Sequence, residues 1–241
     1  ERLRPPFPAQ PADDVAVGIE DADRRHVDGW QTLLPPRFAQ VIWRANDSGA
    51  SGLPYDLCFD NPPELQQTLK SVIEKSGADL KQVSVNKQQW HLAILRSGSG
   101  ATERSLWMEY DAGNGHGHRD ALNLGLFAHG LDLMPDFGYP PVQFGGWESA
   151  RALWYKSTAA HNTVLIDGKE QDAGQTGKTT LWAAGEGFNA ISVAAPAVYG
   201  SAGAKKYERT IALIDTSDRD SYALDVFRVA GGSDHAKFFL S

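Results

Sequence analysis

Three of the seven histidines in this chain lie within fourteen residues, in the stretch GHGHRDALNLGLFAHG at residues 115–130. His116 and His118 are separated by a single glycine. On extended backbone, side chains at positions i and i+2 point to the same face, whereas on a helix the same spacing turns them well apart. An H-x-H pair on extended chain is therefore a candidate half-site for a metal ion, and an ordinary polar loop is the alternative.

Two further groups strengthen the metal interpretation. Asp136 closes the apolar stretch into which His118 leads, and His161 stands directly before the apolar run of HNTVLIDG. Two imidazoles and one carboxylate, with water as the fourth ligand, suit a tetrahedral zinc ion. Asp120 and Asn162 are candidates to orient the imidazoles. Asp120 is equally compatible with a loop carboxylate that accepts hydrogen bonds from nearby backbone N–H groups.

The segment 121–136 must bring these groups together. Its apolar residues alternate with period two as far as His129–Gly130, which is typical of a hairpin turn, and two more leucines lead out of that turn. The pattern predicts a β-hairpin. Since the two ends of a hairpin lie near one another, we expect His118 and Asp136 to approach each other.

The same strand-type pattern continues to the end of the chain. Short β-type runs, punctuated by glycine, asparagine and aspartate, include QWHLAILRS, SLWMEYDAG, FNAISVAAPA, YERTIALIDTS and YALDVFRVA. Strands at this density indicate an antiparallel β-sandwich or a related all-β architecture. Before residue 82 the pattern is helical, with helices expected at 37–44 and within NPPELQQTLKSVIEKSGADL. We therefore expect a linker and helical domain at 1–82 and a β-sandwich at 83–241.

Composition narrows the class of protein. The chain has 241 residues, of which 41% are hydrophobic and 22% charged, as in soluble globular proteins with a sizeable core. Its formal net charge of −7 argues against a nucleic-acid binder. The single cysteine, Cys58, excludes an internal disulfide framework. No apolar run approaches a membrane span, and the first residues are no signal peptide. The first residue is not methionine and KFFLS at the end resembles a strand, so we expect a piece of a longer protein.

At the level of whole motifs, the run GNGHGHRDALNLGLFAHGLDLMPDFG, followed by STAAHNTVLIDGKEQ, resembles the heparinase II/III-like polysaccharide lyases. The family pattern is H-x-H-x-D, an apolar hairpin, D-x-G, and then H-N-T-V with D-G soon after. The later YERTIALIDTSDRDSYALDVFRVAGGSDH resembles the next strands of that family. The resemblance covers about 83–241. It implies an antiparallel β-sandwich preceded by an incomplete α/α toroid, of which the helices before residue 82 would be the end.

The resemblance also implies an activity and roles for residues. Such lyases cleave uronic-acid polysaccharides such as heparan sulfate or alginate by β-elimination, and they are periplasmic or secreted proteins of bacteria. Carried over by motif, His116 corresponds to the histidine at the catalytic centre. His118, Asp136 and His161 correspond to a metal-binding set, usually for zinc, that mainly organises the site. The expected partner is an acidic polysaccharide.

The remaining parts of a lyase site are less sharply marked. The family takes its tyrosine from the toroid; Tyr139 is the best local candidate for a catalytic tyrosine, with Tyr155 as another and an ordinary loop aromatic as the alternative. Arg119 and Arg151 flank the motif and are candidates to meet carboxylate or sulfate groups. Trp147 is a candidate to stack on a sugar ring.

Two other functions are compatible with the same residues. A non-catalytic carbohydrate-binding β-sandwich would keep the metal as a structural ion. A metal-dependent hydrolase would need a metal-bound water that faces the substrate. Oligomeric state is not indicated by any of these patterns.

Overall fold

The computed structural model describes residues 36–45, 63–80, 82–113 and 117–240. The chain divides into two compact units, Glu1–Lys81 and Gln82–Ser241. The boundary expected from the sequence falls one residue later. Within the described ranges, no helix is long and apolar enough to cross a membrane.

The first unit contains two helices, α2 (Pro36–Ala45) and α3 (Pro63–Ser76). α2 extends the helix expected at 37–44 by one residue at each end, and α3 lies within the second segment expected to be helical. Ala39 of α2 packs with Leu69 and Ile73 of α3 in a small apolar cluster. Gly77 has a φ of 79° and its N–H donates to the carbonyl of Ile73, which closes α3 with a left-handed residue, as glycine does at many helix ends.

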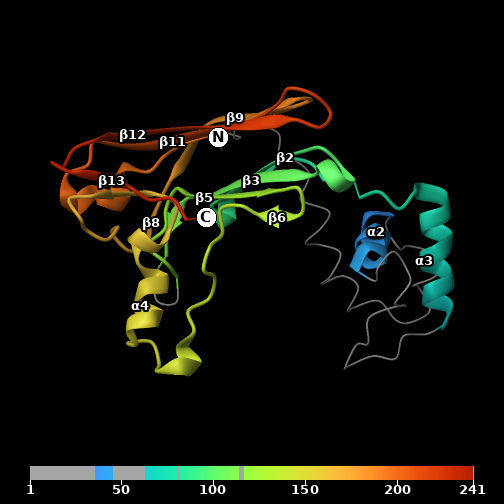
Figure 1. The fold of residues 1–241 in the computed structure, drawn as a ribbon, viewed down its shortest axis with the longest axis horizontal. Coiled ribbons are helices and arrows are strands. Elements are labelled where there is room, and N and C mark those ends of the chain that lie inside the picture. The colour runs from blue at the N-terminus through green and yellow to red at the C-terminus, as the bar shows by residue number, and fades with distance from the viewer. Residues whose placement is uncertain (1–35, 46–62, 81, 114–116, 241) are drawn as a thin grey trace, which may run out of the picture. The chain divides into compact units, whose positions relative to one another are not determined.

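The second unit is built from two antiparallel sheets that lie face to face (Figure 1). One has five strands in the order β1-β2-β3-β5-β6, and the other has four in the order β12-β11-β10-β9. Two short pairs, β13 with β7 and β4 with β8, complete the unit. The mainly antiparallel β fold with a short helical segment before it is confirmed.

The strands of the second unit are β1 (Val85–Lys87), β2 (Leu92–Ser97), β3 (Arg104–Glu109), β4 (Asp111–Ala112), β5 (Asn123–Ala128), β6 (Leu131–Asp132), β7 (Val164–Ile166), β8 (Gln175–Thr176), β9 (Lys178–Gly185), β10 (Phe188–Ala194), β11 (Lys206–Asp215), β12 (Ser221–Ala230) and β13 (His235–Lys237).

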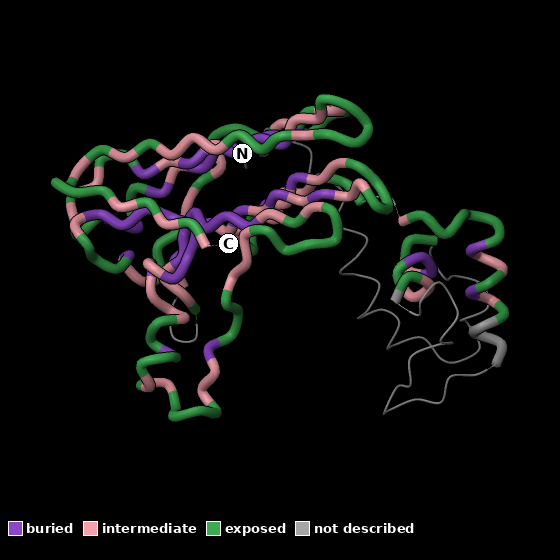
Figure 2. The backbone as a smooth tube through the Cα atoms, in the orientation of Figure 1, coloured by how far each residue is buried: buried purple, intermediate pink, exposed green. Residues whose placement is uncertain are grey.

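The core lies between the two large sheets, where the buried backbone is concentrated (Figure 2). Register places residues of one face directly opposite each other: Met108 of β3 pairs with Leu124 of β5, and Ile191 of β10 pairs with Ile211 of β11. All four are buried in one cluster. The period-two alternation in the sequence reflects this arrangement, because alternate residues of each strand face the core.

The predicted hairpin is present as β5 and β6. Ala128 pairs with Leu131 across a two-residue turn in which His129 and Gly130 have φ values of 54° and 75°. Positive φ at both turn residues is the type I′ geometry that matches the twist of the strands. Because β6 ends at Asp132, the chain then leaves the sheet and reaches Asp136.

The helix α4 (Ala150–Lys156) was not expected. After Asp136 the chain runs away from the sheets and returns through α4 (Figure 1). Ser149 caps this helix, since its hydroxyl accepts a hydrogen bond from the N–H of Ala152. The 3-10 turn η6 (Thr158–Ala160) follows and leads to His161.

Candidate metal centre

Four metal-ligating side chains converge at one end of the hairpin. Within the described residues, His118, Asp120, Asp136 and His161 each offer one ligand atom, and these atoms all lie within 4.8 Å of one another. His118 precedes the hairpin, Asp136 follows it, and His161 ends η6. The structure therefore brings together the three residues that were expected to bind a metal, and it adds Asp120.

The ligand atoms are close enough to share one ion. His118 Nδ1 lies 3.0 Å from His161 Nε2, and a carboxylate oxygen of Asp136 lies 3.4 Å from the same Nε2. A tetrahedral zinc ion with bonds of about 2.0–2.2 Å separates its ligand atoms by about 3.3–3.6 Å. The distance from His161 to Asp136 lies in this range, that from His161 to His118 is shorter, and the other ligand atoms lie up to 4.8 Å apart, so the four residues form a candidate site for one ion.

Hydrogen bonding fixes the tautomer of one imidazole. His161 is fully buried, and its Nδ1 lies 2.8 Å from the carbonyl oxygen of Ser157. A carbonyl can only accept, so Nδ1 carries the proton and Nε2 keeps its lone pair. That lone pair is directed at His118 and Asp136, as a metal ligand's would be.

The charges of the cluster are arranged for a cation. Burial lowers the pKa of His118 and of His161, which keeps both imidazoles neutral as ligands must be. Burial, with the negative charges of Glu109 and Asp136, raises the pKa of Asp120 well above its usual range. Burial, Asp111 and Asp136 likewise raise the pKa of Glu109 to about 7. A divalent ion would neutralise this concentration of carboxylates.

Asp120 is more than a loop carboxylate. It is 5% exposed, and one of its carboxylate oxygens lies 3.9 Å from His161 Nε2. A backbone hydrogen bond also acts on this carboxylate, so the geometry is compatible with both roles expected of Asp120. Its position makes it a candidate fourth ligand in place of water.

Asparagine side chains hold the two backbone segments that carry the ligands. Asn123, buried at the start of β5, donates from Nδ2 to Asp136 and accepts from the backbone N–H of Asn162. Asn162 donates from Nδ2 to the carbonyl of Leu124. The expectation that Asn162 orients an imidazole is wrong, because its amide binds backbone groups. It positions His161 indirectly, by tying the residue after it to β5.

A buried polar network supports the same segments from behind. Arg209 of β11 donates from Nη1 to the carbonyls of Leu122 and Asn162, and it forms a two-pronged ion pair with Asp225 of β12. Gln171 bonds both the N–H and the carbonyl of Ala121. Sequence reasoning missed these positioning residues. The signal for Arg209 is a charged residue at a core-facing position in the alternating run YERTIALID.

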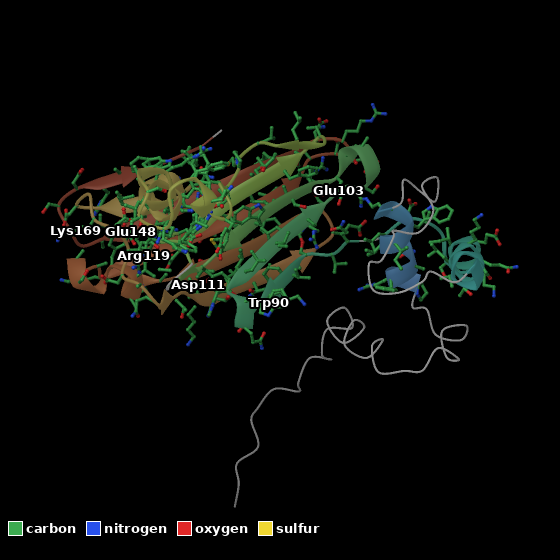
Figure 3. The ribbon with its side chains drawn as sticks, turned by 90° about the horizontal axis from the view of Figure 1, so that it is seen from below. Trp90, Glu103, Asp111, Arg119, Glu148 and Lys169 are labelled. Atoms are coloured by element: carbon green, nitrogen blue, oxygen red, sulfur yellow. The ribbon has the colours of Figure 1, made fainter. Side chains whose placement is uncertain are left out.

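The other expected site residues have diverse surroundings. His116 lies outside the described residues. Tyr139 is 65% exposed, and its ring meets that of Trp147 edge-on at 5.6 Å. Arg151 lies over the ring of Tyr155 at 5.9 Å. Figure 3 shows Arg119, which is half-buried and lines a pocket beside the cluster.

Known proteins resemble the part of the chain that contains these motifs. The sequence model for the C-terminal domain of heparinase II/III-like proteins matches residues 75–226. The chain belongs to this family. An exo-oligoalginate lyase from Saccharophagus degradans is 32% identical over 105 residues, which are 41% of this chain and 13% of that protein. An alginate lyase from Stenotrophomonas maltophilia is 32% identical over 84 residues, 32% of this chain and 11% of that protein.

Solved structures confirm the fold. A heparinase III structure superposes with a TM-score of 0.55 at 21% identity, covering 69% of this chain and 25% of that one. A heparan sulfate lyase mutant from Pedobacter heparinus superposes with a TM-score of 0.54 at 18% identity, covering 83% of this chain and 28% of that one. The chain thus spans about a quarter of these structures and a smaller share of the curated relatives.

Proposed function

We propose that this chain is the β-sandwich part of a polysaccharide lyase that cleaves a uronic-acid polymer by β-elimination. The observation that carries the proposal is the convergence of His118, Asp136 and His161 from three separate segments, in a chain of the heparinase II/III-like family. The names of its relatives, alginate lyases and heparan sulfate lyases, support a substrate that contains uronic acid.

In this reaction a base removes the proton from C5 of the uronic acid. The C4–O bond then breaks, the electron pair forms a C4=C5 double bond, and the leaving oxygen takes a proton from an acid. Because the C5 proton is weakly acidic, stabilisation of the charge that develops on the carboxylate is the largest requirement. A histidine or tyrosine is suited to carry the protons.

We assign the proton-handling roles to His116 and Tyr139. His118, Asp136 and His161 would hold zinc, which when bound supplies charge that fixes the ligands and neutralises the carboxylates around it. This role is mainly structural: with Asp120 as a fourth ligand, the coordination shell would be closed. A closed shell favours a lyase over a hydrolase that depends on metal-bound water.

The test has two parts, turnover and metal content. The full-length protein, incubated with alginate and with heparan sulfate, should generate the ultraviolet absorbance of an unsaturated uronate. Metal analysis of the chain should find one zinc that is lost in His118→Asn and in Asp136→Ala. His129→Asn is the matched control: His129 lies in the hairpin turn with positive φ, which asparagine tolerates, and zinc should remain.

Each failure has a distinct meaning. Absence of unsaturated product from every uronate polymer would refute the lyase. Binding of acidic glycans without turnover would favour the carbohydrate-binding alternative, and saturated products would favour a hydrolase. A chain without zinc would refute the metal centre.

A further inference from the structure

A pocket opens beside the group of four side chains that forms the candidate metal centre. Its volume of about 510 Å³ lies within the range of about 300–1,000 Å³ that small-molecule sites occupy. Most of its wall comes from two segments, with Gly117 and Arg119 on either side of His118 and Trp154 and Lys156 in α4, and Glu170 adds a third. The backbone N–H of Arg119 donates to the carbonyl of Lys156, which joins the two walls. The pocket is therefore part of the framework that carries His118.

One nitrogen of the Arg119 guanidinium lacks a hydrogen-bond acceptor in the part of the chain that the structure describes. Its Nη1 is buried from water and has no hydrogen-bond partner among the described residues. Arg119 acts on Asp172 through its charge, but both carboxylate oxygens of Asp172 already accept hydrogen bonds from Ser201. Few buried polar atoms of native proteins lack a partner, so the guanidinium of Arg119 needs an acceptor that the described residues do not supply.

The other walls suit an acidic sugar. Lys156 adds a second positive charge, and its ammonium lies 5.3 Å from the ring centre of Trp147. Glu170 supplies one carboxylate, which already accepts a hydrogen bond from the N–H of Thr158. Trp154, 45% exposed, offers an aromatic surface for the apolar face of a saccharide. Two cations beside an exposed indole match an anionic group on a sugar ring.

We propose that this pocket binds one acidic sugar residue of the polymer, with its carboxylate or sulfate group on Arg119 and Lys156 and its ring against Trp154. The proposal rests on the proposed function for the nature of the ligand. It concerns binding beside the metal centre, and binding can be measured without turnover.

The experiment titrates the chain with three hexasaccharides and follows heat of binding by calorimetry. An oligoguluronate carries carboxylates only, a heparin fragment also carries sulfates, and cellohexaose is neutral. We expect binding of at least one acidic ligand, weakened about ten- to a hundred-fold by Arg119→Gln and by Lys156→Gln, and weakened by salt. The acidic ligand that binds more tightly identifies the anionic group. Cellohexaose should not bind measurably.

Two controls separate binding from folding. Arg228→Gln removes the same charge from an exposed arginine of β12 that pairs with Glu208 of the neighbouring strand β11, and it should leave the affinity unchanged. Arg119→Gln should leave the melting temperature unchanged or raise it, because the side chain gives up no partner at Nη1. A structural role for Arg119 would instead lower the melting temperature.

Equal affinities for the original chain and Arg119→Gln would overturn the proposal, and so would failure of both acidic ligands to bind. If acidic ligands bind through Arg119 but the full-length protein gives no unsaturated product, the pocket stands and the lyase fails. If product forms and Arg119→Gln changes no affinity, the lyase stands and the pocket fails.

Discussion

Removal of the Arg209 guanidinium should destabilise the sandwich and the candidate metal centre together. Arg209 is fully buried on β11, and its partners are the carboxylate of Asp225 and the carbonyls of Leu122 and Asn162. Those two carbonyls belong to the segments that lead from Asp120 and from His161. Arg209→Met keeps the length and much of the volume of the side chain but removes every donor.

The expected loss in the free energy of unfolding follows from the buried groups that Arg209→Met leaves without their donor. Two buried carbonyls lose a donor, and Asp225 keeps Lys237, whose Nζ lies 2.7 Å from it, as its cationic partner. Breaking a buried ion pair by removing one partner costs about 3–5 kcal/mol. For a unit of this size, a loss of about 4 kcal/mol lowers the melting temperature by about 8–16 °C.

Urea unfolding followed by circular dichroism would measure this loss, with Arg228→Met as the matched control. Arg228 forms an ion pair with Glu208 at 3.0 Å, but the arginine side chain is 56% exposed, so its loss should cost less than about 1 kcal/mol. The double variant Arg209→Met/Asp225→Leu should recover part of the loss, because it removes the carboxylate that loses two guanidinium hydrogen bonds in the single variant. Equal effects of Arg209→Met and Arg228→Met would refute the reasoning.

Three further outcomes are expected. Gly125→Ala would place a Cβ atom 2.0 Å from the indole of Trp107, so we expect a cost of about 1–3 kcal/mol and altered tryptophan fluorescence, while Gly185→Ala, with 3.7 Å to its nearest neighbour, should be neutral. Burial acts to raise the pKa of Asp225, but hydrogen bonds and nearby positive charge outweigh burial and lower it. A lowered native pKa stabilises the fold above the ordinary value of about 4, and this stability is lost as the pH falls through the native pKa, so Asp225→Asn should show a shallower loss of stability in acid. Zinc at a hundredfold excess over its dissociation constant should add about 2.7 kcal/mol to the free energy of unfolding, an effect that a chelator reverses and Asp136→Ala abolishes.

Local patterns in the sequence were enough to predict part of the site. The alternation after residue 121 and the His129–Gly130 turn predicted the hairpin, and a hairpin necessarily returns the chain toward its start. The approach of Asp136 to His118 followed from that geometry alone. His161 was proposed as a ligand because a polar imidazole precedes an apolar strand, and the family motif supported it, but no local pattern states which strand end lies beside which.

Other features depend on register and on contacts between distant segments. α4 has seven residues, too few for the periodicity of an amphipathic helix to stand out, and its serine cap is a weak signal in isolation. Asn123 reads as a polar residue that interrupts an apolar run until its contacts with Asp136 and Asn162 are known. β9 was missed because its run of threonines and alanines lacks the large apolar residues that mark a core strand.

The candidate metal centre and the buried polar network around Arg209 form one structural unit, and this explains the placement of so many buried polar groups. Arg209 lies on the core-facing side of β11, where period-two alternation would otherwise require an apolar residue. Its donors satisfy the carbonyl of Leu122, a residue with a φ of 62° that branched or bulky side chains rarely adopt. Leu122 lies two residues after Asp120 and directly before Asn123, so this unusual backbone turn influences where both side chains point. An apolar residue in place of Arg209 would pack as well but would leave that turn without support, and the carboxylates would then have no fixed geometry in which to share a metal ion with His161.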